Sequence, residues 1–143
     1  MITLIKRHRR MLQFGFVGVS GVFVNLAFVW IGLRLLAGTD PILHDAAASA
    51  LGIVVSVFTN FVLNDLWTWG DRRKGPWWVR LGRYYLVSAA AGLLQFGCAM
   101  GLRLSLDVSL YLAQGVGIGL GTVVNYVANN LWTFKATSPS HSE

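Results

Sequence analysis

Two asparagine pairs, each followed by a tryptophan, are the residues of this sequence best suited to bind a polar ligand. They are Asn60, Asn64 and Trp67, repeated 65 positions later as Asn125, Asn129 and Trp132. Each asparagine offers an acceptor oxygen and two N–H donors. Burying a hydroxyl group without a partner in an apolar medium costs roughly 2–7 kcal/mol. Such amides can therefore shelter a hydroxyl-rich head group in apolar surroundings.

The spacing within each copy favours one helical face. Asn60, Asn64 and Trp67 follow the pattern i, i+4, i+7, which brings side chains to the same side of a helix. The apolar stretch that precedes each copy of the motif adds one more amide, Asn25 before the first copy and Gln95 before the second. These two residues lie 70 positions apart in similar stripes of small residues. A purely structural interpretation stays open for any single residue, because small residues and amides also join packed membrane helices, for about 0.6–2 kcal/mol per hydrogen bond. Repetition of the whole set favours binding.

Four long apolar stretches must position these residues. The chain has 143 residues, of which 55% are hydrophobic and 13% are charged. The stretches are residues 12–36, 44–69, 81–106 and 109–134. Each exceeds the ~20 residues that a helix needs to cross the membrane, and the first is too long for the ~7–15-residue core of a cleavable signal peptide. The prediction is an all-α integral membrane protein with four transmembrane helices.

The repeat predicts two tandem helical hairpins that enter the membrane in the same direction. Each copy holds two stretches, so the expected symmetry axis runs along the membrane normal. The predicted membrane domain covers residues 11–135, with repeat one at about 12–69 and repeat two at about 81–134. We expect a basic cytoplasmic segment at residues 1–10 and a disordered cytoplasmic tail at 136–143.

The cations predict the orientation. Ten of the twelve Lys and Arg residues fall on one side of the predicted spans, and only Arg34 and Arg103 lie near the other. Short loops follow the positive-inside rule, so we expect both termini in the cytoplasm. We also expect the protein in the cell's inner (plasma) membrane. The ten are Lys6, Arg7, Arg9, Arg10, Arg72, Arg73, Lys74, Arg80, Arg83 and Lys135.

The basic segment at residues 72–83 is also rich in tryptophan and would attract a phosphate at the membrane surface. Nucleic-acid binding is disfavoured, because the cations lie at membrane boundaries. Cys98 is the sole cysteine and the three histidines are scattered, so we expect neither a metal nor another cofactor. Asp65 is expected to extend to the cytoplasmic interface or to pair with Arg72.

At the doubled motif Asn-x3-Asn-x-Leu-Trp-Thr-aromatic the sequence resembles the GtrA-like family of four-span membrane proteins. Phe16-Val17-Gly18 at the start of the first stretch adds to the resemblance, which covers residues 11–135. The resemblance implies translocation of a polyprenyl-phosphate-linked sugar from the inner to the outer leaflet for cell-surface polysaccharide or glycan modification. Related domains also occur as membrane anchors, so the second hypothesis is an anchor or recruiter for a polyprenyl-phosphate glycosyltransferase.

One departure concerns the phosphate. The family often has a basic residue directly after the second asparagine, where this chain has Asp65 and Asn130. If that cation holds phosphate, its role passes here to residues such as Arg80 or Arg83. The candidate substrate-binding residues are Asn25, Asn60, Asn64, Trp67, Arg80, Arg83, Gln95, Asn125, Asn129 and Trp132.

Other functions are disfavoured. A proton-coupled drug exporter needs an ionisable group deep in the membrane, and no acid lies in the middle of any predicted span. No nucleophile–base pair or carboxylate pair indicates an enzyme. A homodimer that forms the lipid path between its protomers is left open by the sequence.

Overall fold

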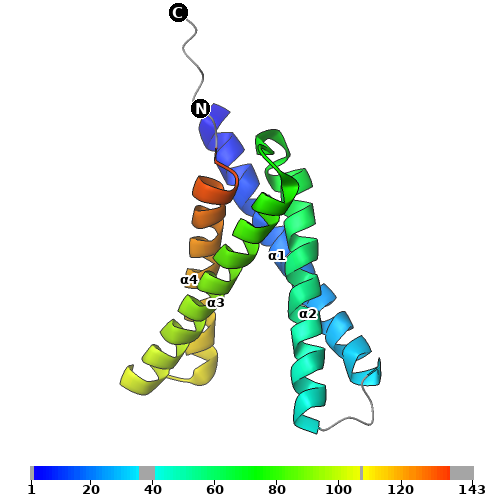
Figure 1. Ribbon diagram of the computed structural model, residues 1–143. Helices are drawn as coiled ribbons and strands as arrows, with labels where there is room; N and C mark the ends of the chain where they lie inside the picture. The colour runs from blue at the N-terminus through cyan, green and yellow to red at the C-terminus, as the bar shows by residue number, and fades with distance from the viewer. Residues whose placement is uncertain (1, 36–40, 107, 136–143) are drawn as a thin grey trace, which may run out of the picture. The chain divides into compact units, whose positions relative to one another are not determined.

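The computed structural model describes residues 2–35, 41–106 and 108–135, and these are helical with short connections and no strand (Figure 1). The four α-helices are α1 (Ile2–Leu35), α2 (Pro41–Leu63), α3 (Trp77–Leu106) and α4 (Leu110–Ala128). Three short turns complete the fold: the π-helical η1 (Asn64–Thr68) and η3 (Asn129–Thr133), and the 3-10 helix η2 (Gly70–Arg72). The predicted disordered tail, residues 136–143, lies outside the described residues.

Three segments of the described residues are long and apolar enough to cross a membrane: His8–Leu35, Ala47–Thr68 and Trp77–Leu106. Each exceeds the ~20 residues required. The protein is therefore an all-helical, multi-pass membrane protein. The fourth predicted span, residues 109–134, corresponds to α4 and η3 and stays a prediction. Many large apolar side chains on these helices are exposed, as lipid contact requires.

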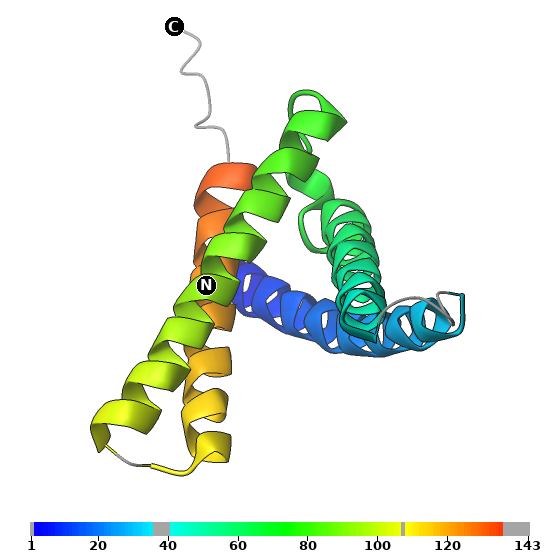
Figure 2. The same cartoon turned by 60° about the horizontal axis from the view of Figure 1, so that its bottom comes forward.

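The first helix pair consists of α1 and α2, which pack against each other within the unit Met1–Asp71 (Figure 2). Its buried apolar side chains are Phe14, Val17, Ala48, Phe61 and Trp69. Glycine brings the two backbones close, since a Cβ atom on Gly32 would lie 2.9 Å from the Ala48 Cα atom. The predicted packing role of the small residues thus applies at this contact.

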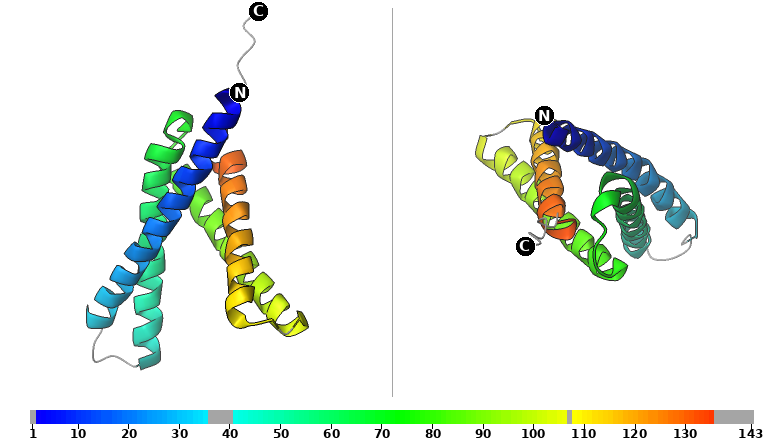
Figure 3. Two further views of the ribbon diagram at one scale, coloured as in Figure 1. Left: turned by 180° about the vertical axis from the view of Figure 1, so that it is seen from behind. Right: turned by 90° about the horizontal axis from the view of Figure 1, so that it is seen from above.

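The second helix pair consists of α3 and α4, which pack against each other within the unit Arg72–Glu143 (Figure 3). Its buried apolar side chains follow those of the first pair at offsets of 70 and 65 positions, so burial follows the sequence repeat. They are Tyr84, Val87, Ala113, Tyr126 and Phe134, joined by Ala91.

A π-helical turn ends the second helix of each pair. The Trp69 N–H donates to the Asn64 carbonyl, and the Phe134 N–H donates to the Asn129 carbonyl, both at 2.8 Å. These bonds span five residues where an α-helix spans four. The extra residue changes which side chains face inward: Trp69 and Phe134 are fully buried, while Trp67 and Trp132 are about half exposed. Regular helical spacing did not predict this change.

Candidate functional site

The predicted site residues are distributed over both helix pairs and gather in separate groups. Asn25, Asn60, Asn64 and Trp67 belong to the first pair; Arg80, Arg83, Gln95, Asn125, Asn129 and Trp132 belong to the second.

A polar groove on the first pair brings together Asn25 from α1 and Asn60 from α2. The groove has a volume of about 280 Å³, and its other lining residues are Gly18, Gly21, Val22, Leu26 and Ser56. Gly21 makes room for the amide, because a Cβ atom there would lie 2.4 Å from the Asn60 Nδ2 and Oδ1 atoms. The groove therefore depends on Gly21, because any side chain at that position would collide with the Asn60 amide.

The Asn60 amide has unused hydrogen-bonding capacity. Its Oδ1 atom is buried and has no hydrogen-bond partner among the described residues. The Ser56 hydroxyl, one turn away, donates to the Ile53 carbonyl at 3.0 Å. A buried acceptor without a partner costs about 1–3 kcal/mol, so a ligand that donates a hydrogen bond here removes a cost already present in the fold.

Asn64 lies one turn from Asn60 but takes a different role. Its side chain is 1% exposed, and its Oδ1 atom accepts a hydrogen bond of 2.7 Å from the Thr68 hydroxyl. Trp67 is 48% exposed and touches the Phe16 ring edge-on, with the centroids 6.0 Å apart. The single face expected for Asn60, Asn64 and Trp67 therefore does not extend to Trp67, because the π-helical turn intervenes.

The second pair carries the same motif with a different hydrogen-bond pattern. Asn129 Nδ2 donates to the Asn125 side-chain oxygen at 2.6 Å and to the Asn125 carbonyl at 3.0 Å. The Asn129 Oδ1 and Thr133 Oγ1 atoms are buried without a partner among the described residues. Gln95 packs close to α4, since a Cβ atom on Gly121 would lie 3.0 Å from its Cβ atom. In the second pair the first asparagine of the motif, Asn125, therefore already accepts a hydrogen bond from within the protein.

The Arg80 side chain forms hydrogen bonds within the protein. Its side chain is 7% exposed, and its Nη1 atom donates to the carbonyls of Lys74 at 3.3 Å and Gly75 at 2.7 Å. Gly75 has a φ of 71°, a left-handed conformation that glycine adopts without strain. Arg80 therefore holds the turn that precedes α3.

Arg83 lies over the ring of Trp132. The guanidinium carbon is 5.4 Å from the ring centroid, within the range of a cation–π contact. Its Nη1 atom also donates to the Trp132 carbonyl at 3.5 Å. Arg83 and Trp132 thus form a pair of their own at the end of the second helix pair.

Two adjoining cavities on the first pair contain residues that the sequence analysis did not select. One, of about 350 Å³, is lined by Arg9, Arg10, Gln13, Leu66, Trp67, Thr68, Gly70 and Asp71. The other, of about 340 Å³, is lined by Arg9, Leu12, Gln13, Phe16 and Trp67. The repeat held the signal that could have found these residues, because the offset of 70 aligns Arg10 with Arg80 and Gln13 with Arg83.

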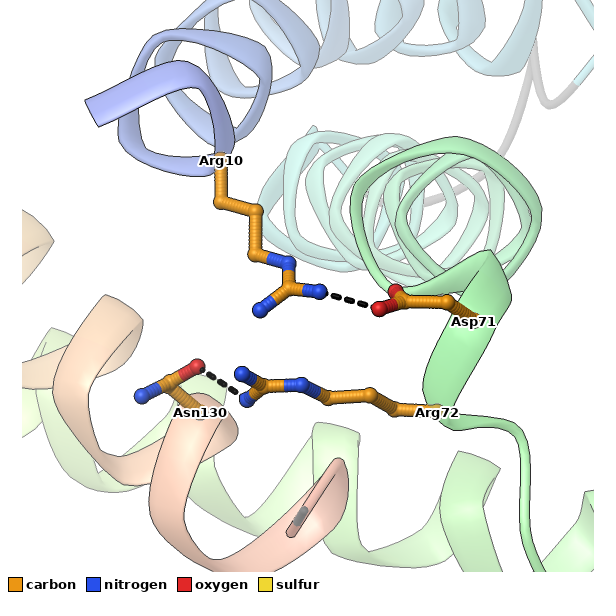
Figure 4. Close-up of polar contacts among 4 residues, drawn as sticks. All are labelled: Arg10, Asp71, Arg72 and Asn130. Carbon is orange, nitrogen blue, oxygen red and sulfur yellow. Dashed lines mark hydrogen bonds and ion pairs between the residues drawn. The ribbon is translucent and has the colours of Figure 1, made fainter. Parts of the chain in front are cut away.

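Polar contacts hold the segment after η1 and the start of η3. Arg10 forms an ion pair with Asp71 in the first unit, and in the second unit Arg72 Nη1 donates to Asn130 Oδ1 at 2.9 Å (Figure 4). Asp65 is 2% exposed, so the expected extension of its side chain to the interface is wrong, and the alternative, a pair with Arg72, stays a prediction. The position of Asp65 inside the π-helical turn points it into the protein.

Two comparisons relate this chain to known proteins. Residues 13–134 match the model of the family described as "GtrA/DPMS, transmembrane domain". The chain is also similar to a protein of Pyrococcus furiosus named dolichol-phosphate mannosyltransferase, with 30% identity over 120 residues. That match covers 84% of this chain but only 32% of the relative, so the chain corresponds to about a third of that protein.

Proposed function

Since the chain belongs to the family of GtrA/DPMS transmembrane domains, we propose that it moves a polyprenyl-phosphate-linked sugar from the inner to the outer leaflet. The sugar would then serve cell-surface polysaccharide or glycan modification. The link to lipid-linked sugars rests on the family and on the relative named dolichol-phosphate mannosyltransferase.

The observation that carries this proposal is the groove at Asn25 and Asn60. The groove lies within segments apolar enough to cross a membrane, and it presents a buried amide oxygen without a partner. A sugar that leaves water loses the hydrogen bonds of its hydroxyls, which costs several kcal/mol unless polar partners replace them. A hydroxyl that donates to Asn60 Oδ1 satisfies both groups at once.

The membrane arrangement proposed with this function has four spans in two tandem hairpins of the same direction. Both termini and the loop of residues 72–76 would face the cytoplasm, as the positive-inside rule predicts. We place the protein in the inner (plasma) membrane. Movement is passive in this proposal. Carrying one negative charge outward along an inside-negative potential is favoured by about 2.3 kcal/mol per 100 mV.

A second candidate function, anchoring or recruiting a polyprenyl-phosphate glycosyltransferase, is favoured by a specific observation. The similarity to the mannosyltransferase covers only a third of that relative, so most of the relative lies outside the part that this chain matches. In this reading the chain is a non-enzymatic membrane domain, and the transfer reaction belongs to a partner.

The test reconstitutes the purified protein into liposomes with a polyprenyl-phosphate sugar and measures how fast the sugar becomes accessible on both leaflets. We expect acceleration over empty liposomes. The double variant Asn60→Leu/Asn125→Leu should insert normally and lose the acceleration. The matched control is Thr122→Val, which removes a polar group from an exposed position of α4 and should keep full activity.

Full activity in the double variant would assign both asparagines to packing. No acceleration by the unaltered protein with several sugars would contradict translocation. Co-purification with a glycosyltransferase, lost on charge reversal of Arg72 and Arg73, would then support the anchor.

A further inference from the structure

We propose that the two adjoining cavities at Trp67 form a subsite for the phosphate of a membrane lipid. The subsite consists of Arg9, Arg10 and Gln13 on α1 and Trp67 in η1. This inference rests on the proposed function, because it names where the phosphate of the transported lipid is held. It also assigns the phosphate to residues other than Arg80 and Arg83.

The subsite has cations that a ligand can reach. Arg9 is exposed and lines both cavities. Arg10, whose side chain is 14% exposed, is paired with Asp71, whose side chain is 62% exposed. Exposed ion pairs are weak, whereas arginine binds phosphate through two parallel, charge-assisted hydrogen bonds. A phosphate can therefore displace Asp71 from Arg10.

Gln13 supplies the polar group that the fold leaves unused. Its side chain is 8% exposed and lines both cavities. It forms no side-chain hydrogen bond with any residue in the described part of the chain. The N–H groups of this amide can donate to a phosphate oxygen.

The walls of the second cavity indicate a lipid rather than free phosphate. Leu12, Phe16 and Trp67 line it beside Arg9 and Gln13. Leu12 and Phe16 are largely exposed and Trp67 is about half exposed, and Phe16 contacts Trp67 edge-on. An amphipathic site of this kind suits a ligand whose charged group lies at the membrane surface and whose chain continues along apolar side chains.

In the second helix pair a cation fills the position equivalent to Gln13. Gln13 corresponds to Arg83, and Trp67 corresponds to Trp132. Arg83 lies over the Trp132 ring, whereas the described residues place no cation over Trp67. At the position of Gln13 the second copy therefore carries a cation, and only the first copy keeps an amide there, where it lines both cavities.

The subsite also lies in line with the groove. Gln13, Val17 and Gly21 recur every four residues along the inner face of α1. The eight residues from Gln13 to Gly21 span about 12 Å of helix. A phosphate held at Gln13 therefore has the groove of Asn25 and Asn60 about two turns deeper along the same helix.

The experiment uses the full chain in phosphatidylcholine nanodiscs and measures binding of farnesyl phosphate by calorimetry. We expect Gln13→Leu and Arg10→Gln each to weaken binding by about tenfold, the effect of one hydrogen bond to a charged group. Asp71→Asn should tighten binding about two- to fivefold, because it removes the competitor for Arg10. The charge-matched control is Lys135→Gln, at an exposed position of the second unit, which should leave the Kd unchanged.

Unchanged binding in Gln13→Leu and Arg10→Gln would overturn the inference, and so would inorganic phosphate binding as tightly as farnesyl phosphate. Titration with phosphatidic acid distinguishes the source of the lipid phosphate: tighter binding of farnesyl phosphate identifies an isoprenoid carrier, and the reverse identifies a glycerolipid. The gain expected for Asp71→Asn cannot arise from misfolding.

If liposome translocation persists while these variants bind normally, the subsite is wrong and the proposed function stands. If binding follows the prediction without translocation, the subsite stands and the function fails.

Discussion

Individual side chains in the two copies of the motif form different hydrogen bonds although their types are identical. Thr68 donates to Asn64 in the first copy. In the second copy Asn129 donates to Asn125, and the Thr133 hydroxyl has no partner among the described residues. The sequence could therefore identify which residues form the polar set, but not which of them stay available to a ligand, because that depends on neighbours from the packed helix.

The threonines offer a matched pair of substitutions. Thr68→Val removes a donor from the buried oxygen of Asn64 and should lower the free energy of unfolding by about 1–3 kcal/mol. Thr133→Val removes a hydroxyl that is already unpaired, so its effect should be near zero or stabilising. Thermal unfolding in detergent measures both. Equal losses in the two variants would contradict the assigned hydrogen bonds.

Gly21 gives a second residue-scale prediction. A Cβ atom there would lie 2.4 Å from the Asn60 amide, so Gly21→Ala should push this side chain out of its position in the groove. We expect translocation to slow about tenfold, the equivalent of one lost hydrogen bond, with little change in stability because only the end of a side chain moves. Gly15→Ala is the control, since its Cβ atom would have nothing within 4 Å. An unchanged translocation rate in Gly21→Ala would show that the position of the Asn60 side chain does not matter for transport.

Whole helices were more predictable than their ends. Long apolar runs predicted the segments that became α1 to α4, and small residues predicted close contacts, which the structure has at Gly32, Gly52 and Gly121. The helical start at Ile2 was not predicted, because the basic segment 1–10 lacks the apolar pattern of a span. The π-helical turns were missed because five residues barely alter hydrophobic periodicity.

Gly52 tests the contact between α1 and α2. A Cβ atom there would lie 2.8 Å from the Asn25 carbonyl oxygen and 2.5 Å from the Val29 Cγ2 atom. Gly52→Ala should separate the helices and cost about 1–3 kcal/mol of unfolding free energy, because backbone atoms cannot yield as a side chain can. Gly97→Ala, with nothing within 4 Å, should be neutral in the same unfolding measurement. A neutral Gly52→Ala would mean that this contact is looser than described.

The whole chain consists of two helical units, Met1–Asp71 and Arg72–Glu143, each with its own buried apolar side chains. Orientation in the membrane depends on the whole charge distribution, and the orientation derived from the sequence stays a prediction. The family could also be predicted, and the match over residues 13–134 confirms it. The ligand could not be identified in the same way, because the two copies present similar residues with different exposure.

The predicted orientation can be tested with single cysteines in a Cys98→Ser background. Lys74→Cys lies in the loop before α3, and Ser109→Cys lies at the start of α4. In intact cells an impermeant maleimide should label position 109 and should reach position 74 only after the membrane is opened, because the cations keep their side in the cytoplasm. Labelling in the opposite order would reverse the topology and, with it, the direction proposed for transport.

The π-helical turns also bear on the ancestry of the protein. A turn that spans five residues where four suffice accommodates one inserted residue without unravelling the helix on either side. Both copies carry such a turn at the same place in the motif, at Asn64–Thr68 and Asn129–Thr133. If one hairpin gave rise to both by gene duplication, the insertion occurred before the duplication. The common ancestor was then a single hairpin that already buried the aromatic residue after its Trp-Thr pair.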